Sequence, residues 1–292
     1  MPRSHLLNNF QYVTIYVGSQ VLRDWQHALE GAGPPATYRK YKMNIRIDAK
    51  ITTAFLFSIL ALLVFGHFFS VIMAFRFDYH NDVIFDYINL DDEENLSTFF
   101  SASMLLFSSL LLFVIFAFHR QDKNGEYKYW LALALLFLFL AIDESSKVHE
   151  KVIDAYWTLF GQHENSKADN YIWVIAYGGF ALVIAAVYLR FVLSQPRKTC
   201  LLIFVAAALY VGGALGMEVI GALYVDQSYF RESATYDFSR FNGKYFLISG
   251  TEESMEMLGV LTFIYTLLAY IEMKWRGLYI INRPSGGEAS PS

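Results

Sequence analysis

Six long apolar segments constrain the fold of this chain more than any other feature of its sequence. A bilayer core about 30 Å thick needs roughly 20 apolar residues in a helix that rises 1.5 Å per residue. Hydrophobic residues make up 55% of the 292 residues and charged residues 17%, a balance outside the usual range of soluble domains. We therefore predict an all-α, polytopic membrane protein, a six-transmembrane-helix bundle. The predicted spans are 51–75, 96–118, 129–149, 171–193, 201–225 and 252–271.

Basic residues predict the orientation of these spans. With six spans both termini share a side, and 16 of the 23 Lys and Arg residues fall on that side, in the terminal segments and the second and fourth loops. Basic segments near span ends stay in the cytoplasm, so we expect both termini to be cytoplasmic. The expected division is a cytoplasmic segment over 1–50, a transmembrane domain over 51–273 and a cytoplasmic tail over 274–292 whose end is disordered. We expect the protein in the cell membrane, in contact with lipid.

The sequence also excludes several classes of protein. One cysteine, Cys200, leaves no intramolecular disulfide and no thiolate cluster. Neither a phosphate-binding glycine loop nor a nucleic-acid module is present, so we expect no nucleic-acid partner. Lipid and other membrane subunits are the partners that remain.

Two predicted spans are too short unless they include acidic residues. The apolar run 129–142 has 14 residues and covers only about 21 Å, so we expect its helix to continue through Asp143 and Glu144. The run 257–271 has 15 residues, which draws Glu253 and Glu256 into the membrane. Glu218 stands alone within 201–225.

These acids and two histidines fall at a similar depth, near the outer face of the membrane. His67 lies about 12 Å from the end of the first span. A charged side chain costs roughly 2.5–3.5 kcal/mol in this zone, so such residues usually face one another or a wet cavity and mark function. Carboxylates with one or two imidazoles bind iron, manganese or zinc. The candidate metal ligands are His67, Asp143, His149, Glu218 and Glu256, with Glu144 and Glu253 as candidate catalytic acids or bases.

Structural explanations remain open for each residue, because no established metal-binding motif is present. Asp143 and Lys147 have the spacing of a helical ion pair. Glu252 and Glu253 would be favoured at a helix N-terminus by the helix dipole. For His67 the alternative to metal binding is a hydrogen bond to a serine or a carbonyl group. For the acidic run 91–94 the alternative is a solvated loop without a further role.

Three short strings resemble those of bacterial multi-pass membrane proteins of unassigned function. They are Asp143-Glu144-x4-His149-Glu150, Gly216-x-Glu218 and Glu252-Glu253-x-x-Glu256-x-x-Gly259. The resemblance covers the third, fifth and sixth spans. The resemblance implies a location in the bacterial inner membrane. It implies no activity and no cofactor.

Three functions fit these observations. The first is a membrane-embedded enzyme in which a divalent metal, iron, manganese or zinc, acts on a lipid-like substrate from the outer, periplasmic side. The second is a non-catalytic subunit or assembly factor of a membrane complex. The third is a cation- or proton-coupled transporter, for which the apolar inner halves of the spans offer no polar path.

Overall fold

The computed structural model describes residues 13–17, 44–77, 79, 87–92, 95–123, 125–148, 151, 158, 172–221 and 243–282. The chain divides into two compact units. The terminal unit comprises Met1–Thr52 and Leu268–Ser292, and the helical unit comprises Thr53–Leu267.

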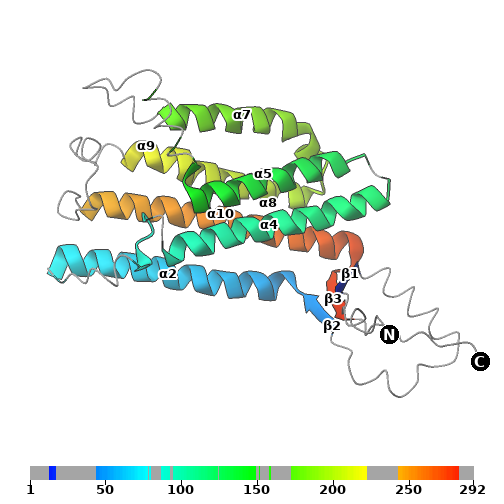
Figure 1. The fold of residues 1–292 in the computed structure, drawn as a ribbon, viewed down its shortest axis with the longest axis horizontal. Coiled ribbons are helices and arrows are strands. Elements are labelled where there is room, and N and C mark those ends of the chain that lie inside the picture. Colours follow the sequence, from blue (N-terminus) through cyan, green and yellow to red (C-terminus); the bar gives the residue numbers. More distant parts are fainter. Residues whose placement is uncertain are drawn as a thin grey trace, which may run out of the picture. The chain divides into compact units, whose positions relative to one another are not determined.

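Six helical segments are long and apolar enough to cross a membrane, as the sequence predicts. The fifth is composite, because α8, a π-helical turn and α9 follow one another without a break. The helices are α2 (Ala49–Phe77), α4 (Leu96–Gln121), α5 (Tyr127–Ser146), α7 (Ile172–Leu193), α8 (Arg197–Val211), η3 (Gly212–Met217), α9 (Glu218–Gly221) and α10 (Gly243–Trp275) (Figure 1).

Two of the helix ends that differ from the predicted ones bear on the acidic residues. The helix α5 ends at Ser146 rather than near 149, because Lys147 takes the left-handed conformation with φ 52° and its N–H bonds to the Asp143 carbonyl. The helix α10 begins at Gly243, nine residues before the predicted start, and has 33 residues. Glu252, Glu253 and Glu256 therefore lie within this helix, nine or more residues after its start.

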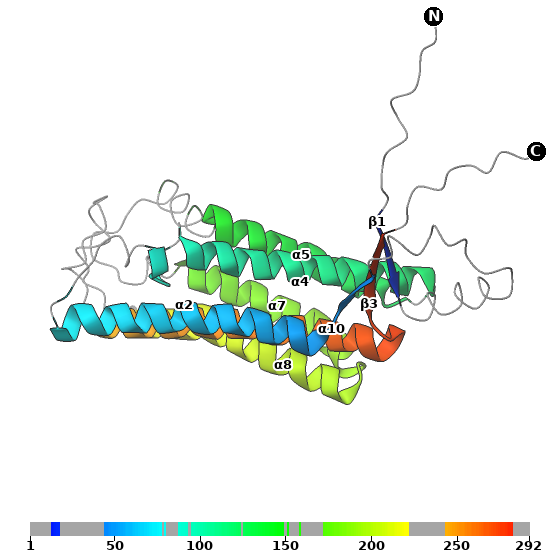
Figure 2. The same cartoon turned by 90° about the horizontal axis from the view of Figure 1, so that it is seen from below.

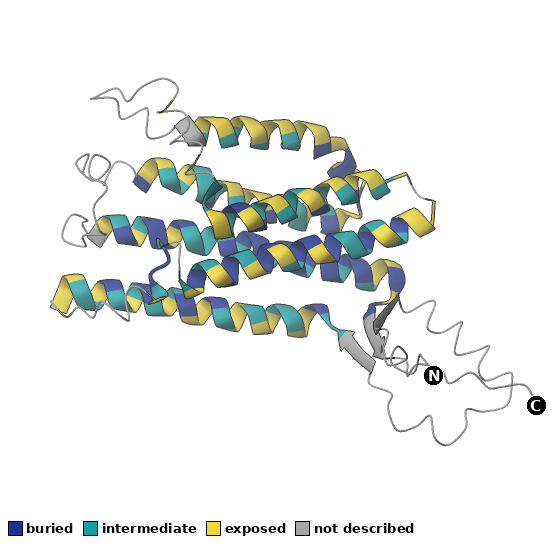
Figure 3. Ribbon diagram, in the orientation of Figure 1, coloured by how far each residue is buried: buried dark blue, intermediate teal, exposed yellow. Residues whose placement is uncertain are grey.

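Within the helical unit, α10 is the most buried of the six spans. In its most apolar stretch 61% of residues are buried, against 11% for α7 (Figure 3). The rings of Phe137 on α5 and Phe263 on α10 stack at 4.7 Å. Large apolar side chains point outward on the other helices, for example Phe65 and Leu182. This distribution places the polar residues of α10 inside the unit and leaves an apolar exterior suited to lipid.

The terminal unit contains a small antiparallel sheet that the sequence analysis did not predict. Its strands are β1 (Val13–Val17), β2 (Asn44–Ile47) and β3 (Leu278–Asn282), in the order β1-β3-β2 (Figure 2). Gly277, with φ 116°, makes the turn from α10 into β3, a conformation that favours glycine. The Ala49 N–H donates to Glu272 Oε1 at 3.0 Å. The sheet thus joins segments that were expected to be separate. Residues 284–292, expected to be disordered, lie outside the described part.

Candidate functional site

Four polar residues lie on one face of α10. They follow one another at spacings of four, three and four residues, which stacks side chains along a helix. They are Tyr245, Ser249, Glu252 and Glu256. Because α10 begins at Gly243, Glu252 lies in its third turn, beyond the first-turn range of the dipole. The helix-dipole explanation for Glu252 and Glu253 is therefore wrong.

Glu218 lies beside this face of α10 because the segment formed by η3 and α9 approaches α10 closely. The π-helical turn η3 comes directly before Glu218, and such turns are frequent at functional sites. A Cβ added at Gly213 would lie 2.9 Å from the Glu252 carbonyl oxygen and 2.9 Å from Glu256 Cγ, so glycine is required here. The Glu218 and Glu252 side chains form a hydrogen bond. Two carboxyl groups form such a hydrogen bond only when one of them is protonated.

Glu256 extends the acidic contacts toward α5. It interacts electrostatically with Glu144 of α5 and with Glu252 and Glu218. Tyr210 of α8 lies within electrostatic range of both Glu256 and Glu144. Acids from α5, α9 and α10 therefore influence one another, and a tyrosine hydroxyl from α8 lies among them.

Asp143 and Glu253 lie at the edge of this arrangement. Asp143 is 7% exposed, and the Tyr177 hydroxyl of α7 lies 3.3 and 3.4 Å from its two carboxylate oxygens. Both acids are within electrostatic range of Tyr210. Tyr210 therefore links them to Glu256.

Asp91 is an acidic residue of this region that the sequence analysis did not include among the candidate site residues. It is partly buried, and the Tyr245 hydroxyl donates to its Oδ1 at 3.1 Å. Burial raises the pKa of Asp91 from 3.8 to about 7; hydrogen bonds from Tyr245 and Ser249 oppose that shift, and the negative charge of Glu218 adds to it. The solvated-loop explanation is wrong for this residue.

His67 of α2 is fully buried and binds backbone groups through both ring nitrogens. The Leu90 N–H donates to Nδ1 at 3.1 Å, so Nε2 carries the hydrogen and donates to the Phe246 carbonyl at 3.0 Å. A Cβ at Gly250 would lie 2.5 Å from His67 Cδ2, so the ring packs directly on the α10 backbone. In this position His67 connects α2, the Asp91 loop and α10, and neither ring nitrogen is available for a metal. The hydrogen bond to a carbonyl group is the structural alternative given for His67 in the sequence analysis.

The structure thus brings some of the predicted site residues together and separates others. Glu144, Glu218 and Glu256 interact directly or through Glu252, while His149 lies outside the described residues. Among the described residues, no three His, Cys, Asp or Glu side chains are grouped closely enough to hold a metal ion. The sequence analysis missed Tyr210 and Tyr245; extending the last helix to Gly243 would have placed Tyr245 on the face of Glu252.

The fold and site define a class: a bundle of helices that are long and apolar enough to cross a membrane, with acids that interact with one another between the helices. The chain belongs to the family described as Domain of unknown function (DUF8692), whose model matches residues 54–271. Neither the curated proteins nor the solved structures contain a match to this chain.

Proposed function

We propose that this protein is a multi-pass protein of the cell membrane, the inner membrane in a bacterium, with both termini in the cytoplasm. The six apolar helices support this topology, as does the excess of Lys and Arg in the terminal segments and around the two turns on the same side. The basic residues around these turns are Arg120, Lys123, Lys128, Arg190, Arg197 and Lys198. Cysteine-accessibility labelling tests it. In intact cells that carry the variant Cys200→Ser/Ser285→Cys, a membrane-impermeant thiol reagent should label the protein only after the membrane is permeabilised; labelling before permeabilisation would contradict a cytoplasmic C-terminus.

We further propose that the acids of α5, α9 and α10 bind a divalent cation, iron, manganese or zinc, at the outer side of the membrane. The hydrogen-bonded pair Glu218–Glu252 carries this proposal, because two carboxyl groups in a poorly solvated interior need a proton or a cation between them. A metal would take the place of the shared proton. Glu218, Glu252 and Glu256 are the ligands that this arrangement favours.

Ion binding needs more than the contacts present in the described residues. Since no three donors are already grouped there, the carboxylates would turn toward the ion, or His149 would supply a further ligand. Glu144 and Glu253 would then accept or donate protons, and Asp143 would stay oriented by Tyr177. We propose that such a site belongs to a membrane-embedded enzyme acting on a lipid-like substrate, because the surrounding surface is apolar.

A transporter is less well supported by the contacts beneath the acids. Phe263 lies seven residues after Glu256 on the same face of α10, and its ring stacks on Phe137 at 4.7 Å. The polar face of α10 therefore ends at packed aromatic rings. A coupled flux of cations or protons into liposomes would overturn this preference.

Elemental analysis of protein purified without chelator tests the cation site. We expect a stoichiometric transition metal that is lost in Glu218→Gln and in Glu252→Gln and kept in Glu272→Gln, a carboxyl of the terminal unit. Added Mn²⁺ or Zn²⁺ should raise the melting temperature of the metal-stripped wild type and leave that of Glu252→Gln unchanged. Folded protein that neither carries nor takes up these metals would contradict the proposal, and its co-purification with a partner would favour the non-catalytic subunit.

A further inference from the structure

Basic residues gather at one end of the helical unit, away from the acids. The turns α4–α5 and α7–α8 lie together there, since the Tyr188 hydroxyl donates to the Tyr129 carbonyl at 3.0 Å and Tyr129 stacks on Phe191 at 4.7 Å. We name this region the basic end. It is defined by six residues of these turns and their flanking helix ends: Arg120, Lys123, Lys128, Arg190, Arg197 and Lys198.

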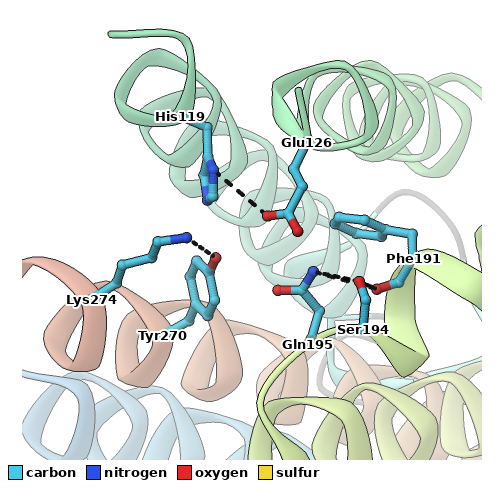
Figure 4. Close-up of polar contacts among 7 residues, drawn as sticks. All are labelled: His119, Glu126, Phe191, Ser194, Gln195, Tyr270 and Lys274. Atoms are coloured by element: carbon cyan, nitrogen blue, oxygen red, sulfur yellow. Dashed lines mark hydrogen bonds and ion pairs between the residues drawn. The ribbon is translucent and has the colours of Figure 1, made fainter. Parts of the chain in front are cut away.

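These positive charges are largely uncompensated. The same stretches, 116–130 and 186–202, contain only two acids, Asp122 and Glu126. Glu126 approaches His119 Nδ1 at 3.8 Å (Figure 4). Within the part of the chain that the structure describes, no carboxylate forms an ion pair with Arg190 or Arg197. The basic end therefore presents a net positive surface.

Two of the basic side chains run along aromatic rings. Lys198 Nζ lies 5.6 Å from the centre of the Tyr265 ring and 3.5 Å from its hydroxyl. The Arg120 guanidinium lies 5.9 Å from the centre of the Phe116 ring. Aromatic residues with long cationic side chains beside them are typical of the level of the lipid headgroups.

The turn that carries Arg197 and Lys198 is held by internal hydrogen bonds. Gln195 is buried and its amide donates to the Phe191 carbonyl at 3.3 Å, while the Ser194 hydroxyl donates to the same carbonyl at 2.7 Å (Figure 4). These hydrogen bonds therefore fix the backbone of the turn and so the positions of the charged residues on either side of it.

We propose that the basic end binds the headgroups of anionic phospholipids. Phosphodiester groups at the cytoplasmic surface complement its charge, and clustered Lys and Arg beside transmembrane helices attract anionic lipid. The inference rests on the membrane insertion proposed above and is independent of the cation site. A metal-free protein that binds anionic lipid would refute the cation site alone.

Lipid titration of the full chain in detergent, followed by native mass spectrometry and thermal unfolding, tests the proposal. We expect phosphatidylglycerol to bind the wild type and raise its melting temperature, and phosphatidylcholine to do neither. In the double variant Arg197→Gln/Lys198→Gln the affinity for phosphatidylglycerol should fall about 30-fold at low salt, roughly fivefold for each charge. The matched double variant Arg76→Gln/Lys151→Gln removes two exposed basic residues outside the basic end and should keep the wild-type affinity.

Several results would overturn the proposal. These are equal affinity of the wild type for the two lipids, equal losses in the two double variants, or a thermal shift that inorganic phosphate reproduces at the same concentration. If the first double variant does not fold, Arg190→Gln alone replaces it, with an expected loss of about fivefold.

Discussion

Asp91→Asn isolates the cost of holding a carboxylate in the loop before α4. Asparagine has the size of a protonated aspartate, and its side-chain carbonyl accepts the Tyr245 hydrogen bond that Asp91 accepts at 3.1 Å. The variant therefore keeps the contact and removes the ionisation. Any stability difference that depends on pH then reports the charge of Asp91.

The magnitude follows from the pKa, which burial raises from 3.8 to about 7. A group whose pKa is raised on folding binds its proton more tightly in the folded state, so the wild type loses stability as the pH rises from about 4 to about 7. A shift of about three pH units at 1.36 kcal/mol each gives a full cost of about 4 kcal/mol above pH 7. At pH 5 the same relation gives only about 1–2 kcal/mol. The advantage of the variant should therefore grow by about 2–3 kcal/mol between pH 5 and pH 8.5.

Thermal unfolding in a non-ionic detergent at these two pH values measures the difference. For a unit of this size, 1 kcal/mol corresponds to about 2–4 °C, so the gap in melting temperature should widen by about 5–10 °C. The control Asp122→Asn removes an exposed carboxylate from the α4–α5 turn. The reasoning is refuted if the gap between Asp91→Asn and the wild type is the same at both pH values, or if Asp122→Asn shows an equal widening.

Two further predictions concern the packing of the site. Gly213→Ala should destabilise the protein by about 1–3 kcal/mol in thermal unfolding, because its Cβ would lie 2.9 Å from the Glu252 carbonyl oxygen. The control is Gly216→Ala in the same π-helical turn. Its Cβ meets nothing within 4 Å, so this variant should be neutral or stabilising. His67→Leu should lower the free energy of unfolding by about 1–3 kcal/mol, because it leaves the buried Leu90 N–H without its acceptor. Hydrogen exchange at the Leu90 amide should therefore accelerate. Slow exchange in a folded variant would show that His67 does not hold the loop.

Helix number and the membrane-type character of the bundle were predictable, because long apolar runs leave few alternatives. The start of α10 was not, because residues 243–251 contain Gly, Lys, Ser and Thr and do not form an apolar run, although Phe246 and Ser249 are buried. Apolar length was thus a poor guide to where that helix begins.

The acidic site was predictable in part. Glu218 stood out because it has no acidic or basic neighbour within its span, and the structure pairs it with Glu252. Asp91 carried no such signal, because its burial depends on a loop whose position is set by His67 and Tyr245 from two other helices. The sheet was missed for a similar reason: it pairs short strands from opposite ends of the chain.

The strand order of the sheet determines when it can form during protein synthesis. β1 and β2 both pair with β3 and not with each other, so they have no strand partner until the ribosome has translated all six spans. Pairing over such a sequence separation is slow to form. The terminal unit is therefore the last part of the protein to be completed, and a nascent chain that stalls within α10 cannot form it.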